Sequence, residues 1–186
     1  MKQYYLDRLV YKDNAITTIW YSNDIAGFLT ENNGLLVFTD SQEAETYAKV
    51  HGNQLEAESS KLDLSDIPKL LNSIELNESC SVLINIWFAA SDLSKSLSVD
   101  FLGDTDEDLV LDVYYKLFYG MNIRALKAIE YHPTFDDEEW ATCIAVLNDG
   151  LTLLNSQIEG FQVDLLEVKS TTQIDGPVYP MRSLDK

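Results

Sequence analysis

The side chains that could do chemistry in this chain are two histidines, two cysteines and a large excess of carboxylates. The possible soft metal ligands, His51, Cys80, His132 and Cys143, never fall at a CxxC or HxxxH spacing, which argues against a transition-metal site. No G-x-S-x-G elbow and no glycine-rich phosphate loop occurs. We therefore predict no cofactor, no metal and no enzymatic activity. A pair of carboxylates brought together by the fold is the one catalytic arrangement that the sequence leaves open.

The acidic run that begins at Asp104 resembles the first half of a calcium-binding EF-hand loop. It lacks the central glycine, and the twelfth position, where such a loop needs a bidentate glutamate, is Tyr115. The run is therefore not expected to bind calcium.

The strongest feature of the composition is a net charge of −18 on 186 residues. The acids are not a detachable tail, because residues 1–93 hold fourteen acids and six bases, and residues 94–186 hold seventeen and seven. Aromatic residues make up 11% of the chain, which is typical of a folded protein rather than of an acidic disordered one. Such a surface repels nucleic acids and anionic membranes. A basic protein is the partner that this charge favours.

One expected helix, from about Thr105 to Tyr119, combines acids with tyrosines. Steps of about 100° per residue place its apolar side chains on one broad face. The opposite face is expected to carry Asp104, Asp108, Asp112, Tyr115 and Tyr119, with Asp106 and Glu107 beside its start. Tyrosines supply contact area at low entropic cost and carboxylates pair with Lys and Arg, so these residues are predicted to bind a basic partner. The alternative is an ordinary solvated face whose tyrosines pack on neighbouring loops.

A second acidic cluster opens the next expected helix. Its members are Asp136, Asp137, Glu138 and Glu139. Negative charge in a first turn stabilises a helix through its dipole. Four successive acids exceed what capping needs, so we predict that this cluster also contributes to binding.

The elements that must position these clusters follow from the periodicity of the chain. Strands are expected around Tyr5–Tyr11 and Ala15–Tyr21. A second hairpin is expected from strands over residues 27–31 and 35–39, with its turn at Asn33-Gly34, because Asn-Gly is the pair preferred for type I′ turns. Residues 55–64 are ambiguous, with a polar strand as one possibility. A strand over residues 161–168 is expected to close the sheet.

Helical spacing predicts the remaining elements. Helices are expected over residues 40–52, 65–71, 78–97, 105–119 and 136–159, the last as one helix interrupted at Gly150 or as two. Residues 123–131 are expected to form a strand. The pattern predicts an α+β fold, with N-terminal antiparallel hairpins packed against several helices in one domain, residues 1–169, followed by an irregular tail, residues 170–186.

The N-terminus has no apolar core of a signal peptide, and no apolar run is long enough to cross a bilayer. Two cysteines do not make a secreted disulfide framework, so both are predicted to be buried reduced thiols. A cytoplasmic location is expected. The sequence is compatible with a monomer and with a homodimer.

The charge, the size, the absence of catalytic motifs and the acidic-aromatic helix together resemble the immunity proteins of bacterial polymorphic and contact-dependent toxin systems. That resemblance implies an inhibitor that binds a basic toxin domain, often a nuclease, and occludes its active or substrate-binding surface with carboxylates in place of phosphates. Immunity folds are diverse, so the resemblance implies no topology.

Two other functions fit the same composition. An acidic secretion chaperone would hold an unfolded segment along apolar grooves, and most such chaperones are dimers. A DNA-mimic inhibitor would space its carboxylates like phosphates along an elongated molecule.

Overall fold

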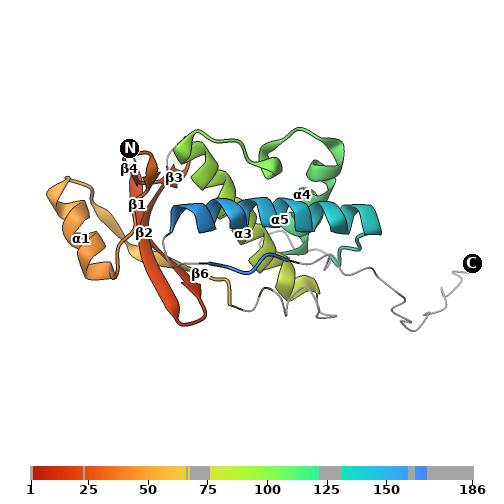
Figure 1. The fold of residues 1–186 in the computed structure, drawn as a ribbon, viewed down its shortest axis with the longest axis horizontal. Helices are drawn as coiled ribbons and strands as arrows, with labels where there is room; N and C mark the ends of the chain where they lie inside the picture. The colour runs from red at the N-terminus through yellow and green to blue at the C-terminus, as the bar shows by residue number, and fades with distance from the viewer. Residues whose placement is uncertain are drawn as a thin grey trace, which may run out of the picture.

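The computed structural model of this chain describes residues 2–22, 24–65, 67, 76–121, 131–158 and 162–166. Its main sheet has four strands in the order β3 (Gly27–Phe28), β2 (Asn14–Ser22), β1 (Gln3–Tyr11) and β6 (Leu55–Asp63). Its helices are α1 (Ser41–Val50), α3 (Leu76–Leu97), α4 (Asp108–Gly120) and α5 (Asp137–Gln157). The sheet lies between α1 on one side and the group formed by α3, α4 and α5 on the other (Figure 1). The predicted α+β fold is confirmed.

The first hairpin follows the predicted alternation of side chains. β1 and β2 pair antiparallel along their whole length, and Lys12 adopts a left-handed φ of 53° in the turn between them. Successive side chains of a strand point to opposite faces. Leu9 therefore packs with the group of three helices, whereas Leu6 packs with α1. The hairpin supplies apolar side chains to both helical layers.

The second hairpin is shorter than expected, and its turn lies one residue earlier. It joins β4 (Thr30–Glu31) to β5 (Gly34–Leu35), and the turn residues are Asn32 and Asn33, with φ values of 53° and 63°. The predicted Asn33-Gly34 turn is wrong. Asparagine also tolerates the left-handed region, so a pair of asparagines satisfies the type I′ geometry without the glycine.

The ambiguous residues 55–64 form an edge strand over most of their length. β6 runs parallel to β1, and the connection between them carries the other strands and α1. Parallel pairing needs a long crossover, whereas a two-residue hairpin joins antiparallel strands. The sheet is therefore mixed rather than purely antiparallel.

The helical group packs tightly around α3 and α5. Trp87 and Leu83 of α3 are buried with Leu147 of α5 and Val113 of α4. A Cβ placed on Gly150 would lie 2.7 Å from the Cβ of Ala90, so only glycine permits this approach of the two helices. Gly150 does not break the helix, because α5 is continuous from Asp137 to Gln157.

The two cysteines are buried free thiols, as predicted. Burial raises the pKa of Cys80 to about 11 and that of Cys143 to about 12. Both thiols therefore stay protonated at neutral pH, which makes them poor nucleophiles.

The predicted closing strand is wrong over residues 162–166, which form an extended segment outside the sheet. Asn155 of α5 donates to the carbonyl of Val163 at 2.9 Å and accepts from its amide at 2.8 Å. Asn148 bonds the amide and carbonyl of Leu166 in the same way. The seven-residue step from Asn148 to Asn155 in the helix and the three-residue step from Val163 to Leu166 in the extended segment both span about 10 Å. The spacing of the two asparagines therefore matches the spacing of the backbone groups that they bond. The side chains of a helix take the place of a neighbouring strand.

We expect the change Asn155→Ala to lower the free energy of unfolding by about 1–3 kcal/mol, because it leaves two backbone groups of Val163 without their partners. Asn155→Asp is the matched control, since it keeps the acceptor and loses only the donor. Urea denaturation should rank wild type above the aspartate variant and the alanine variant last. Equal midpoints for all three proteins would mean that the bonds to Val163 contribute nothing.

Several predicted elements lie outside the described residues. These are most of the helix 65–71, nearly all of the strand 123–131, and the whole of the tail 170–186.

Within the described part of the chain, every helix is too short or too polar to cross a bilayer.

Candidate functional site

The outer side of α4 carries the predicted acids and tyrosines. Asp108 and Asp112 are exposed, and Tyr115 and Tyr119 keep 50% and 53% of their surface in solvent. Leu111, which the sequence analysis did not single out, is exposed beside them. We call these five residues the α4 face. The opposite side of the helix is buried through Val110, Val113 and Leu117, so the predicted division of this helix is confirmed.

The two tyrosines of the α4 face form a stack. Their ring centroids are 6.1 Å apart with planes inclined by 20°, and the ring of Tyr131 makes an edge contact with Tyr119 at 6.4 Å. Ring pairs with such geometry add stability beyond the area that they bury. The exposed rings are therefore held in place before any partner binds, which lowers the entropic cost of binding.

A second row of rings lies beneath this stack and connects it to the core. Tyr114 contacts Tyr115 at 5.5 Å on the outside, and Trp87 and Phe88 of α3 at 5.7 and 6.2 Å on the inside. Phe118 stacks on Tyr114 at 6.0 Å. The rigid packing of α3 thus supports the α4 face. Helical spacing placed Tyr114 and Phe118 on the inner side, but the contact with Phe88 depends on how α3 and α4 cross.

The acids at the start of α4 lack cationic partners in the described part of the chain. Asp106, Glu107 and Asp108 are exposed, and neither they nor Asp112 forms an ion pair there. The predicted start of this helix at about Thr105 is too early, because α4 begins at Asp108. The N-cap is Glu107, whose side chain makes no capping bond, while Thr105 donates to the carbonyl of Leu102 in the preceding 3₁₀ turn, Leu102–Asp104. The carboxylates of Asp106 and Glu107 are thereby left to solvent.

Asp104 does not belong to the α4 face. Its carboxylate accepts hydrogen bonds from Ser91 and Ser94 of α3 at 2.6 and 3.2 Å and lies 3.6 Å from the amine of Lys95. The side chain therefore bonds α3, although the residue itself remains exposed. The helical spacing of α4 does not reach Asp104, because the helix begins at Asp108. Asp104 lies in the preceding 3₁₀ turn, which directs its side chain toward α3.

The second acidic cluster divides into structural and exposed members. Asp136 caps α5 by accepting hydrogen bonds from the amides of Glu138 and Glu139. The carboxylate of Glu139 in turn accepts a hydrogen bond from the amide of Asp136. Glu139 also pairs with Lys116 of α4 and is only 9% exposed. Glu139 is therefore not a surface contact, contrary to the prediction, because this ion pair fastens α5 to α4. Asp137 and Glu138 remain exposed.

The ion pair between Lys116 and Glu139 also connects α4 to the start of α5. Lys116 lies on the flank of α4, and its amine bonds the carbonyl of Thr134 at 2.9 Å, directly before α5. Lys116 therefore fastens the start of α5 to α4, while Asp137 and Glu138 of that first turn are exposed.

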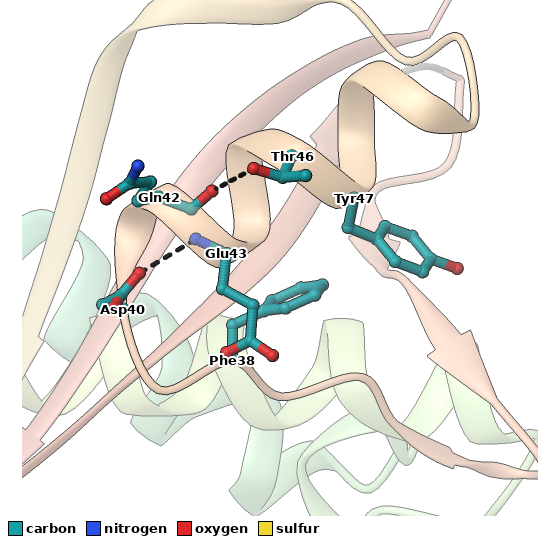
Figure 2. Close-up of a pocket in the computed structure, with 6 residues that line it drawn as sticks. All are labelled: Phe38, Asp40, Gln42, Glu43, Thr46 and Tyr47. Atoms are coloured by element: carbon teal, nitrogen blue, oxygen red, sulfur yellow. Dashed lines mark hydrogen bonds between the residues drawn. The ribbon is translucent and has the colours of Figure 1, made fainter.

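A hollow beside α1 differs from the α4 face, because its polar side chains bond neighbouring groups of the same segment (Figure 2). Its polar side chains are used in bonds that begin the helix. Asp40 accepts from the amide of Glu43 at 2.9 Å, and the carboxylate of Glu43 accepts from the amide and hydroxyl of Thr39. Thr46 donates to the carbonyl of Gln42 at 2.8 Å. We interpret this hollow as a product of helix capping.

In the described ranges, no three histidine, cysteine, aspartate or glutamate side chains gather closely enough to hold a metal ion. What the α4 face can offer is a set of carboxylates and tyrosine hydroxyls for Lys and Arg side chains. No protein-family model, curated protein or solved structure matches this chain.

Proposed function

We propose that this protein is an acidic inhibitor of the immunity type that binds a basic toxin domain through the α4 face and neutralises it. The observation that carries the proposal is the stacked pair Tyr115 and Tyr119, half exposed among acids that have no cationic partner in the described chain. Rigid aromatic anchors surrounded by uncompensated charge are typical of surfaces that bind a protein of opposite charge.

The net charge supports the same function kinetically. With −18 on 186 residues, a basic domain is attracted from a distance, and such steering raises association rates above the unsteered value of about 10⁵–10⁶ M⁻¹s⁻¹. A cell that must inhibit its own toxin benefits from fast capture. If the toxin is a nuclease, carboxylates on this face occupy the positions of substrate phosphates.

Co-expression with the product of the adjacent gene tests the proposal. A folded basic domain should co-purify with this protein and lose its toxicity. Its association rate should fall steeply as salt rises, because the charges involved are exposed. Retention of an unfolded segment with little dependence on salt would instead indicate a secretion chaperone. If no basic protein is retained, the proposed function is wrong.

A further inference from the structure

A cavity of about 280 Å³ lies between the sheet and α3, and its lining includes no residue of the α4 face. We call it the α3 cleft. Asp7 of β1, Trp20 of β2 and Ser60 of β6 line its sheet side, and Phe88 and Asp92 line its α3 side. Its volume lies just below the usual range for sites of small molecules, about 300–1,000 Å³. The cleft is therefore the right size for one long side chain.

We propose that the α3 cleft binds the guanidinium group of an arginine side chain supplied by a protein partner. The inference rests on the proposed function, since the arginine comes from the basic protein that this chain captures. Its basis is the combination of aromatic walls with two carboxylates that form no ion pair among the described residues.

The first carboxylate, Asp7, is almost enclosed. It is 7% exposed and accepts a hydrogen bond from the hydroxyl of Ser60. Its neighbours across the sheet, Thr18 on β2 and Ser60 on β6, are both neutral. A buried carboxylate is costly unless it is paired with a cation, and neither residue directly opposite Asp7 is one.

The second carboxylate, Asp92, lies half-buried on α3. Its carboxylate oxygen Oδ2 accepts a hydrogen bond from the indole nitrogen of Trp20 at 2.7 Å, which fixes the position of the carboxylate. Burial is the main cause that raises the pKa of both Asp7 and Asp92 above the ordinary value. Shifted carboxylates in a cleft are typical of functional sites.

The nearby lysines form their ion pairs with other acids, although the charge of Lys95 also acts to lower the pKa of Asp92. Lys61 lines the cleft, but its amine lies 2.8 Å from the carboxylate of Asp63, and Lys95 bonds Ser91 and lies beside Asp104. In the part of the chain that the structure describes, neither acid of the cleft forms an ion pair. An incoming cation would offset the desolvation of both acids.

The aromatic walls select the kind of cation. Trp20, Phe28 and Phe88 line the cleft beside the carboxylates. A guanidinium group is planar, stacks on aromatic faces and bonds carboxylates with several N–H groups at once, whereas an ammonium group is compact and strongly hydrated. Arginine therefore fits this lining better than lysine does.

The cleft and the α4 face are close enough for one partner to contact both. Phe88, in the wall of the cleft, makes an edge contact with Tyr114 at 6.2 Å, and Tyr114 contacts Tyr115 of the α4 face at 5.5 Å. Of the other residues that line the cleft, Asn85, Ser60 and Lys61 are exposed, so the cleft is open to solvent. An arginine that projects from a domain bound on the α4 face can enter it.

The buried carboxyl group of Asp7 makes the stability of the protein depend on pH. Because burial raises its pKa, the folded protein holds this proton more tightly than the unfolded chain does. The carboxyl group therefore favours folding at low pH and opposes it as pH rises through its raised pKa. We expect Asp7→Asn to melt at a higher temperature than wild type at pH 7.

That advantage of Asp7→Asn should disappear below pH 3.8, the ordinary aspartate value, where wild type is protonated in both states. Asp13→Asn is the control, because Asp13 is exposed in the turn after β1. A wild type that melts above Asp7→Asn at pH 7 would mean that the carboxylate is already compensated by a cation.

The binding test uses the complete chain and a small probe, N-acetylarginine methylamide, with its neutral citrulline analogue as control. The indole N–H resonance of Trp20 reports on binding, because that group touches Asp92. We expect the arginine probe to shift this resonance with a dissociation constant of about 1 mM, the range for a ligand of this size. The citrulline analogue should shift it at least about tenfold more weakly, since it lacks the charge.

Variants that keep the shape of the cleft localise the effect. Asp7→Asn and Asp92→Asn each should weaken the arginine probe about tenfold, while Asp13→Asn should bind like wild type. The proposal is overturned if the Trp20 resonance does not respond to the arginine probe. It is also overturned if citrulline binds equally well, or if the two cleft variants bind as wild type does.

This test is independent of the proposed function, because it needs no protein partner. If the adjacent basic protein is captured but the probe does not bind, only the inference about the cleft fails. If the probe binds and no basic protein is captured, the cleft is confirmed as a guanidinium site and the proposed function fails.

Discussion

Replacing Trp87 with alanine is expected to lower the free energy of unfolding by about 3–5 kcal/mol. The side chain is 2% exposed, and its ring makes edge contacts with Phe101 at 6.4 Å and Tyr114 at 5.7 Å. Its indole nitrogen donates to the carbonyl of Gly103 at 3.2 Å. Truncation leaves a cavity between α3, α4 and the turn before α4, and it also removes the donor from that carbonyl.

Trp87→Phe is the control for this change, because it keeps most of the ring and loses the hydrogen bond. Its expected cost is smaller, about 1–2 kcal/mol. Urea denaturation measures both variants. Because Tyr114 packs on Trp87, the alanine variant should also loosen the Tyr115–Tyr119 stack, visible as altered tyrosine ring resonances. An unchanged midpoint would mean that the side chain is not part of the core.

The second large effect concerns binding. Reversing both Asp108 and Asp112 to lysine is expected to slow association with the basic partner about 10–100-fold at low salt. Both side chains are exposed and make no ion pair within the described residues, so folding should change by no more than about 1 kcal/mol, most of it from the first turn of α4. Stopped-flow mixing with the partner measures the rate.

The matched control reverses Asp13 and Asp24, two other exposed acids, and changes the net charge by the same amount. If the α4 face makes the contact, this control should slow association much less, and the difference should shrink as salt shortens the screening length below about 10 Å. Equal slowing in the two double variants would show that only the overall charge matters. The interface would then lie elsewhere.

The sequence predicted those parts of the site that depend on local spacing. A period near 3.6 residues separates the exposed Asp112, Tyr115 and Tyr119 from the buried Val113 and Leu117, because neighbouring turns of one helix set that division. The start of α5 at Asp136 was predicted for the same reason, since the capping residue of a helix bonds amides only two or three positions away.

The errors in the site arose from contacts between distant segments. Asp104 and Glu139 look like surface acids in the sequence, yet Asp104 bonds α3 and Glu139 pairs with Lys116 of α4. Whether an acid is exposed or paired depends on what lies opposite in space. Periodicity within one segment carries no information about that.

By itself, the sequence determined the charge, the α+β class, most helix positions and the inner and outer sides of α4, because these follow from composition and from spacing within one segment. Only the tertiary structure decided that β6 lies parallel to β1, that two asparagines of α5 hold residues 162–166, and that Asp7 and Asp92 share one cleft. Those features join residues from separate elements, and they exist because strand pairing and helix packing minimise the free energy of the whole chain rather than of any one segment.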